Sequence, residues 1–118
     1  MKNVITKGIR GAITVDENSS EAIRAATLEL LSELLIKNSI DVKDISHVIL
    51  TTTKDLDAEF PAKFARLEMG FDDIAMMCFH EMDVQGALEK CLRAMVVVNC
   101  DESFKPQFVY LKGASNLR

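Results

Sequence analysis

The sequence is poor in the residues from which metal sites and disulfide frameworks are built. It has no tryptophan, one tyrosine, two histidines and three cysteines. Cys78, Cys91 and Cys100 are odd in number and form no Cys-x-x-Cys pair, which favours reduced thiols over disulfides. Proline and glycine are also scarce, at two and five residues, and this argues against linker segments and low-complexity tracts.

Basic residues are outnumbered by acidic ones, and long apolar runs are missing. The 14 lysines and arginines against 18 acidic residues give a formal net charge of −4, which argues against a nucleic-acid partner. No segment approaches the roughly 20 apolar residues of a membrane helix, and the N-terminus lacks the pattern of a signal peptide. We therefore expect one cytoplasmic domain over residues 1–118, with 48% hydrophobic residues to supply its core.

Hydrophobic periodicity predicts an α/β (α+β) domain with a mixed five-stranded sheet, one long helix and two short helices. Runs of apolar and β-branched residues predict strands at residues 4–15, 47–53, 74–79, 92–100 and 107–113. The motif Asn-Ser-Ser-Glu at residues 18–21 predicts the start of the long helix, which ends near Asn38. The short helices are predicted at residues 60–70 and 83–91. Helices are expected to cover one face of the sheet.

The densest cluster of reactive side chains lies at residues 78–93, where the sequence is CFHEMDVQGALEKCLR. Cys78, His80 and Glu81 are possible metal ligands, but their spacing matches no known zinc pattern. Cys78 is also a possible nucleophile, but its neighbours are apolar, and a thiol there is inert unless a cation or a base lowers its pKa. Ordinary packing is favoured for this thiol, and no metal or other cofactor is expected.

Arg93 is the most informative single residue, because it interrupts the otherwise apolar run at residues 92–98. A guanidinium in a mostly buried strand must be paired or must face a polar cavity. An internal ion pair with Glu81 or Glu89 explains the arginine as well as a ligand site does.

Other cations lie in distant segments. Gly8 and Gly11 stand on either side of Arg10 and would let a ligand approach the backbone closely. The ordinary alternative is an arginine on a solvent-exposed face of the strand. Lys63 and Arg66 share one side of a short predicted helix, where exposure to solvent is usual. With Arg93 and the lone Tyr110, these groups indicate a pocket for a small polyanion, since guanidinium forks match carboxylates. Such an inventory favours electrostatic stabilisation or plain binding.

Four segments resemble the AroH class of chorismate mutases, in order and over nearly the whole chain. They are GIRGAITV (8–15), FPAKFAR (60–66), the motif at 78–93 with MVVV after it, and VYL (109–111). The pattern C-x-x-E-M-D-V-x-G-x-L-x-K-C-x-R is far more specific than a catalytic triplet. The resemblance implies a small α/β domain that assembles as a homotrimer, a trimeric pseudo-α/β-barrel with active sites between neighbouring subunits.

The same resemblance implies an isomerase that rearranges chorismate to prephenate on the way to phenylalanine and tyrosine, without metal or cofactor. Arg93 would donate a hydrogen bond to the ether oxygen, Glu81 would face the partial positive charge of the ring, and Cys78 would hydrogen-bond the ring hydroxyl. Arg10 and Tyr110 would hold the side-chain carboxylate. The remaining substrate-binding residues are Phe60, Lys63 and Arg66 of the neighbouring subunit, together with Met77 and Leu117.

Two alternative functions stay open. One is a non-catalytic trimeric module that binds a small carboxylate ligand, with Arg93 and Glu81 as a structural ion pair; the other is imine or enamine hydrolysis on a similar scaffold.

A site that contains both Cys78 and Arg93 also sets a condition on the topology of the sheet. Cys78 and Arg93 can meet at one end of the sheet only if the chain returns antiparallel between their strands.

Overall fold

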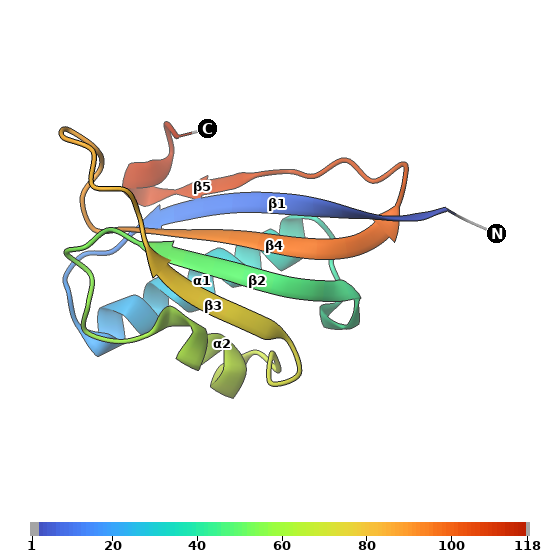
Figure 1. Cartoon of the computed structure of the whole chain (residues 1–118), viewed down its shortest axis with the longest axis horizontal. Helices are drawn as coiled ribbons and strands as arrows, with labels where there is room; N and C mark the ends of the chain where they lie inside the picture. Colours follow the sequence, from blue (N-terminus) through green and yellow to red (C-terminus); the bar gives the residue numbers. More distant parts are fainter. Residues whose placement is uncertain (1–2, 118) are drawn as a thin grey trace.

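A mixed five-stranded sheet with two α-helices forms the fold in the computed structural model, which describes residues 3–117 (Figure 1). The five predicted strands and the two larger predicted helices are confirmed, although β5 is shorter than expected. The elements are β1 (Val4–Thr14), α1 (Ser20–Lys37), β2 (Ile45–Thr52), α2 (Pro61–Glu68), β3 (Ala75–His80), β4 (Cys91–Asp101) and β5 (Val109–Leu111), with single 3₁₀ turns η1 (Val42–Asp44) and η2 (Lys112–Ala114).

The strand order β3-β2-β4-β1-β5 places β4 at the centre of the sheet. β4 runs antiparallel to both β1 and β2, whereas the outer pairs β2–β3 and β1–β5 are parallel. β3 therefore ends, and β4 begins, at the same end of the sheet. The antiparallel return between the strands of Cys78 and Arg93 is thus confirmed.

The prediction of a short helix at residues 83–91 is wrong, because the structure has an irregular loop there. Within it, the amide N–H of Ala87 donates to the carbonyl of Val84, which is a turn rather than a helical hydrogen bond. Gly86 has a φ of +83° and Lys90 a φ of +45°, both in the left-handed region that interrupts a right-handed helix. Lys90 is followed directly by β4.

Helix α1 supplies much of the core. Ser19 is its N-cap, and the Ser19 hydroxyl accepts a hydrogen bond from the Ala22 amide at 3.1 Å. The buried side chains of α1 recur at helical spacing and pack on the inner face of the sheet, close to β1, where only the hydrogen of Gly11 fits. These side chains are Ile23, Ala26, Thr27, Leu30, Leu31 and Leu34. Neither helix in residues 3–117 is long and apolar enough to cross a membrane.

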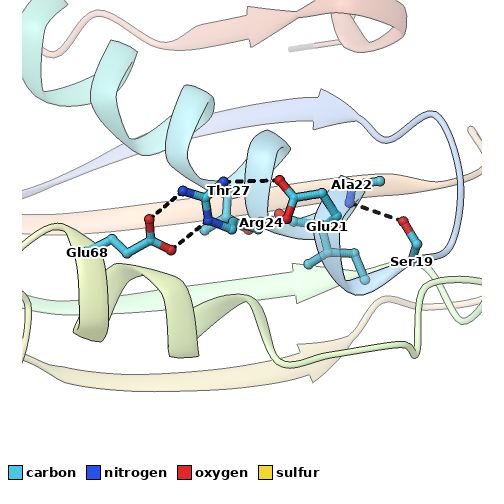
Figure 2. A network of polar contacts seen from close by, with 7 residues as sticks. Ser19, Glu21, Ala22, Arg24, Thr27 and Glu68 are labelled. Carbon is cyan, nitrogen blue, oxygen red and sulfur yellow. Dashed lines mark hydrogen bonds and ion pairs between the residues drawn. The ribbon is translucent and has the colours of Figure 1, made fainter.

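A charged contact joins the two helices (Figure 2). Arg24 of α1 donates to both carboxylate oxygens of Glu68, the last residue of α2, at 2.7 and 2.6 Å. Hydrogen bonding and charge from Glu68 raise the pKa of Arg24, and the same interaction lowers the pKa of Glu68. This two-point contact orients α2, and with it Lys63 and Arg66, relative to the core.

The opposite face of the sheet is covered by neither α1 nor α2 (Figure 1). Side chains on this face include Met77, Phe79 and Met95, which are 62%, 47% and 36% exposed. Exposed apolar residues that are contiguous on a sheet are typical of surfaces that contact another molecule.

Gly11→Ala tests the packing of α1 on β1. An added Cβ would lie 2.9 Å from the Val109 carbonyl oxygen and 3.0 Å from a methyl group of Leu30, so we expect a loss of about 1–3 kcal/mol in the free energy of unfolding. Gly8→Ala is the matched control, because its Cβ would meet only the flexible end of Met95, at 3.2 Å. Urea unfolding that finds equal stabilities for the two variants would contradict this account.

Candidate active site

A row of side chains crosses the uncovered face of the sheet. The strand registers pair Arg93 with Thr51 on one side and with Ala12 on the other, and Ala12 pairs in turn with Tyr110. Residues paired across neighbouring strands point to the same face, so Arg93 lies in the middle of this row. Along β4, Leu92 and Ala94 point the other way and are buried against the helices.

Arg93 and Glu81 line one cavity of about 330 Å³ on this face, together with Arg10 and Thr51. The Arg93 Nε lies 3.8 Å from the Glu81 Oε2, and the two side chains are 36% and 28% exposed. The Thr51 hydroxyl donates a short hydrogen bond to the same Glu81 oxygen, at 2.5 Å. Of the two partners that the sequence allowed for Arg93, the structure therefore selects Glu81. Two arginines against one carboxylate leave the cavity with a positive charge, which suits an anionic ligand.

Arg10 contacts an aromatic ring that the sequence analysis did not single out. Its guanidinium lies over Phe108, 4.9 Å from the ring centroid, which is a cation–π geometry. Phe108 and Thr51 both contact predicted site residues, and the sequence analysis named neither of them. Thr51 is the first of three threonines at the end of β2. A polar residue in an otherwise apolar strand was the sequence signal that could have marked Thr51 as a site residue. Phe108 stands two residues before Tyr110 and showed no such pattern.

Tyr110, at the β5 end of this row, and Leu117 do not line the cavity around Arg93. Both pack against a small cluster of Ala12, Cys91 and Ala114. The Tyr110 hydroxyl oxygen is buried and has no hydrogen-bond partner among residues 3–117. A buried hydroxyl without a partner is destabilising, because the hydrogen bonds that it makes to water in the unfolded chain are lost without replacement.

A second group of predicted residues surrounds α2. Phe60, Lys63, Arg66 and Cys78 line one further cavity, of about 390 Å³. Phe60 is the N-cap residue of α2 and is largely exposed, Lys63 forms an ion pair with Glu59 at 3.5 Å, and Arg66 has no ion pair in the described part of the chain.

The two groups lie on opposite faces of the sheet within one chain. Along β3, Met76 and Cys78 pack toward the core and α2, whereas Met77 points to the uncovered face. Glu81 follows β3 and joins the cavity of Arg93. Cys78 thus accompanies Lys63 and Arg66 rather than Glu81. A single chain does not bring all the predicted site residues together.

The thiols of Cys78 and Cys91 are poorly suited to nucleophilic chemistry. Burial raises the pKa of Cys78, and a backbone hydrogen bond at Ala62 opposes this only in part. Burial also raises the pKa of Cys91, against the opposing charge of Arg93. Within residues 3–117, no three histidine, cysteine or acidic side chains lie close enough together to hold a metal ion.

Comparison with known proteins places these features in a family. The sequence profile described as chorismate mutase type I matches residues 6–118. Chorismate mutase AroH of Bacillus subtilis (strain 168) is 39% identical over 98 residues, covering 83% of this chain and 77% of its own length. Chorismate mutase AroH of Thermus thermophilus is 39% identical over 116 residues, covering 97% and 94%. A solved chorismate mutase from Clostridium thermocellum aligns with a TM-score of 0.87 and 50% identity, over 92% of this chain and 96% of that one.

The fold and the site define a small α+β domain with an arginine- and glutamate-lined cavity on an uncovered sheet face. With the comparisons, the assignment becomes specific. The chain belongs to the chorismate mutase type I family.

Tyr110→Phe tests whether the buried hydroxyl is unpaired in the free protein. Removing it should raise the free energy of unfolding by about 1 kcal/mol, since no hydrogen bond is lost and a desolvated polar group disappears. Thr14→Val is the contrasting control, because the Thr14 hydroxyl accepts a hydrogen bond from Gly113 at 2.9 Å and its loss should lower stability. The measurement is ligand-free chemical unfolding, and a Tyr110→Phe protein less stable than the parent would refute the assignment.

Proposed function

We propose that this protein rearranges chorismate to prephenate by electrostatic stabilisation of the transition state. Membership of the chorismate mutase type I family supports the reaction. The observation that carries the mechanism is the cavity shared by Arg93, Glu81 and Arg10. The reaction moves bonds within one substrate molecule, so it needs charges held in position rather than a nucleophile or a proton relay.

Arg93 and Glu81 act on opposite charges in this mechanism. As the ether C–O bond of the substrate breaks ahead of C–C bond formation, negative charge grows on the ether oxygen, and Arg93 donates to it. Positive charge grows on the ring, and Glu81 faces it while accepting from the ring hydroxyl. The Thr51 hydroxyl, which donates to Glu81, fixes the orientation of that carboxylate. Both charges are in place before the reaction, so no reorganisation is needed as the transition state forms.

The carboxylates of the substrate are held by the remaining polar groups. Arg10 and Tyr110 bind the side-chain carboxylate, and the contact between Arg10 and Phe108 fixes the direction of the guanidinium. Leu117 lies next to Tyr110 and limits access of water from that side. Met77, exposed on the same face, supplies apolar contact and a backbone group at the rim.

A complete site requires a second subunit. Phe60, Lys63, Arg66 and Cys78 share a cavity that is separated from Arg93 by the sheet of their own chain. We propose a homotrimer in which this group of one subunit closes over Arg93 and Glu81 of its neighbour, with Cys78 bonding to the ring hydroxyl. Burial of Met77, Phe79 and Met95 on the uncovered sheet faces would stabilise such an assembly.

Conversion of chorismate to prephenate, followed by absorbance, is the direct test of this function. Arg93→Lys should lower kcat by about 10²–10³-fold, because an ammonium cannot reproduce a guanidinium donor aimed at the ether oxygen. Lys37→Arg is the control for exchange of one cation for another, because Lys37 is exposed in the last turn of α1 and lines neither cavity, and its kcat should stay at the parent value. Absence of any acceleration by the parent protein, with carboxylate binding retained, would favour the non-catalytic module instead.

Mixing two inactive variants tests whether the site is shared between subunits. Arg93→Lys and Arg66→Ala chains, unfolded together and refolded at equal amounts, should regain about a quarter of the parent activity, because random assembly leaves that share of sites intact. Each variant refolded alone is the control. A monomeric mass by light scattering, or mixed samples no more active than either variant alone, would contradict the shared site.

A further inference from the structure

The loop at residues 82–90, between β3 and β4, is attached at one end to Thr52, the last residue of β2, and at the other end to Thr53, which follows it. At the start of the loop, the Glu81 amide donates to the Thr52 carbonyl at 2.8 Å. At its end, the Thr53 amide donates to the Cys91 carbonyl, and the Cys91 amide donates to the Thr53 hydroxyl oxygen, both at 3.0 Å. The residues that flank the loop are therefore held by two successive residues, Thr52 and Thr53.

Asp55, in the turn that follows β2, completes this attachment. Its carboxylate accepts from the Thr53 hydroxyl at 2.5 Å and, through both oxygens, from the Lys90 amide at 3.0 and 3.2 Å. Burial opposes ionisation of Asp55, but the hydrogen bonds from Thr53 and Lys90 outweigh it, and the pKa of the carboxyl is lowered. Asp55 is thus a charged acceptor at neutral pH.

The Lys90 backbone that Asp55 holds has an unfavourable conformation. Its φ of +45° lies in the left-handed region, which is disfavoured for a residue with a side chain. The Lys90 carbonyl accepts from the Val15 amide at 2.7 Å, so Lys90 also ties the end of β1 to the start of β4. Outside interactions must maintain such a conformation, and the Asp55 carboxylate supplies two of them.

We propose that Asp55 is a positioning residue for Arg93, acting through Lys90 and Thr53; this inference rests on the proposed mutase function. Arg93 stands two residues beyond Cys91, opposite Thr51 in the strand register. Loosening the start of β4 would let Arg93 shift relative to Glu81, which is held from the same end of β2. A small displacement of a group that acts in the transition state lowers kcat more than it changes substrate binding.

Asp55→Asn is the primary test. The amide keeps one accepting oxygen and replaces the other with a donor, which cannot accept from the Lys90 amide. We expect kcat for chorismate to fall about tenfold while KM changes by less than about threefold, in a protein that circular dichroism finds folded. Asp57→Asn is the control, because Asp57 is an exposed carboxylate two residues further along the same loop and accepts from the Asn18 side chain at 2.7 Å rather than from Lys90. Its kcat should stay at the parent value.

Lys90→Gly provides a rescue experiment. Glycine adopts the left-handed conformation without a steric cost, so it removes the need for the carboxylate to enforce it. The kcat of the double variant Asp55→Asn/Lys90→Gly should be at least about threefold higher than that of Asp55→Asn alone. A double-mutant cycle with the two single variants and the parent protein measures this coupling. A role of Asp55 in stability alone predicts no such recovery in a folded enzyme. Recovery supports positioning, and its absence overturns the route through Lys90.

A second pair of variants keeps the inference testable if Asp55→Asn does not fold. Thr53→Val removes the hydroxyl that links Asp55 to Cys91, whereas Thr53→Ser retains it, so only the valine variant should lose kcat. Parent-level kcat in a folded Asp55→Asn or Thr53→Val protein would overturn the positioning role while the mutase function stands. No chorismate conversion by the parent protein would overturn the proposed function itself, and this inference with it.

Discussion

Alternation of side chains along β4 is the constraint on which the rest of the structure depends. This strand lies at the centre of the sheet, and its apolar residues, Leu92, Ala94, Val96 and Val98, are buried against the helices. Arg93 stands between two of them and therefore points to the other face. A register shift of one residue would bury the guanidinium and expose the aliphatic side chains, so the hydrophobic core itself maintains the position of the charge. The cavity with Glu81 depends on that register.

The same alternation along β3 divides the candidate site into two halves. Cys78 faces α2, whose Lys63 and Arg66 share its cavity, while Glu81 joins Arg93 on the uncovered face. The α1–α2 contact through Arg24 and the packing of α1 on β1 hold both halves in place without bringing them together. Because these two groups line separate cavities on opposite faces of the sheet, the proposed mechanism needs a neighbouring subunit to bring them together.

Periodicity predicted most of the fold because burial dictates it locally. Strand and helix positions follow from apolar spacing, and Pro61 and Ser19 begin their helices as their side-chain chemistry requires. The prediction of a helix at residues 83–91 was wrong because the interactions that compete with helix formation there come from residues distant in the sequence. Asp55 and Thr53, far away in the sequence, accept hydrogen bonds from the backbone amides of Lys90 and Cys91. Gly86, within the same segment, has a left-handed conformation that interrupts a helix. Phe108 was missed for the same reason, since its contact with Arg10 joins residues that are far apart in the sequence.

The sequence by itself determined the composition of the site and its family resemblance: an arginine within an apolar strand, a nearby glutamate and cations on a short helix. These features depend only on residue type and on spacing over short distances in the sequence. They are therefore the same however the strands are arranged in the sheet. Only the tertiary structure decided that Glu81 rather than Glu89 faces Arg93, and that Cys78 belongs with α2. Those outcomes depend on strand order, register and face, which follow from packing energy summed over the whole domain rather than from any single segment.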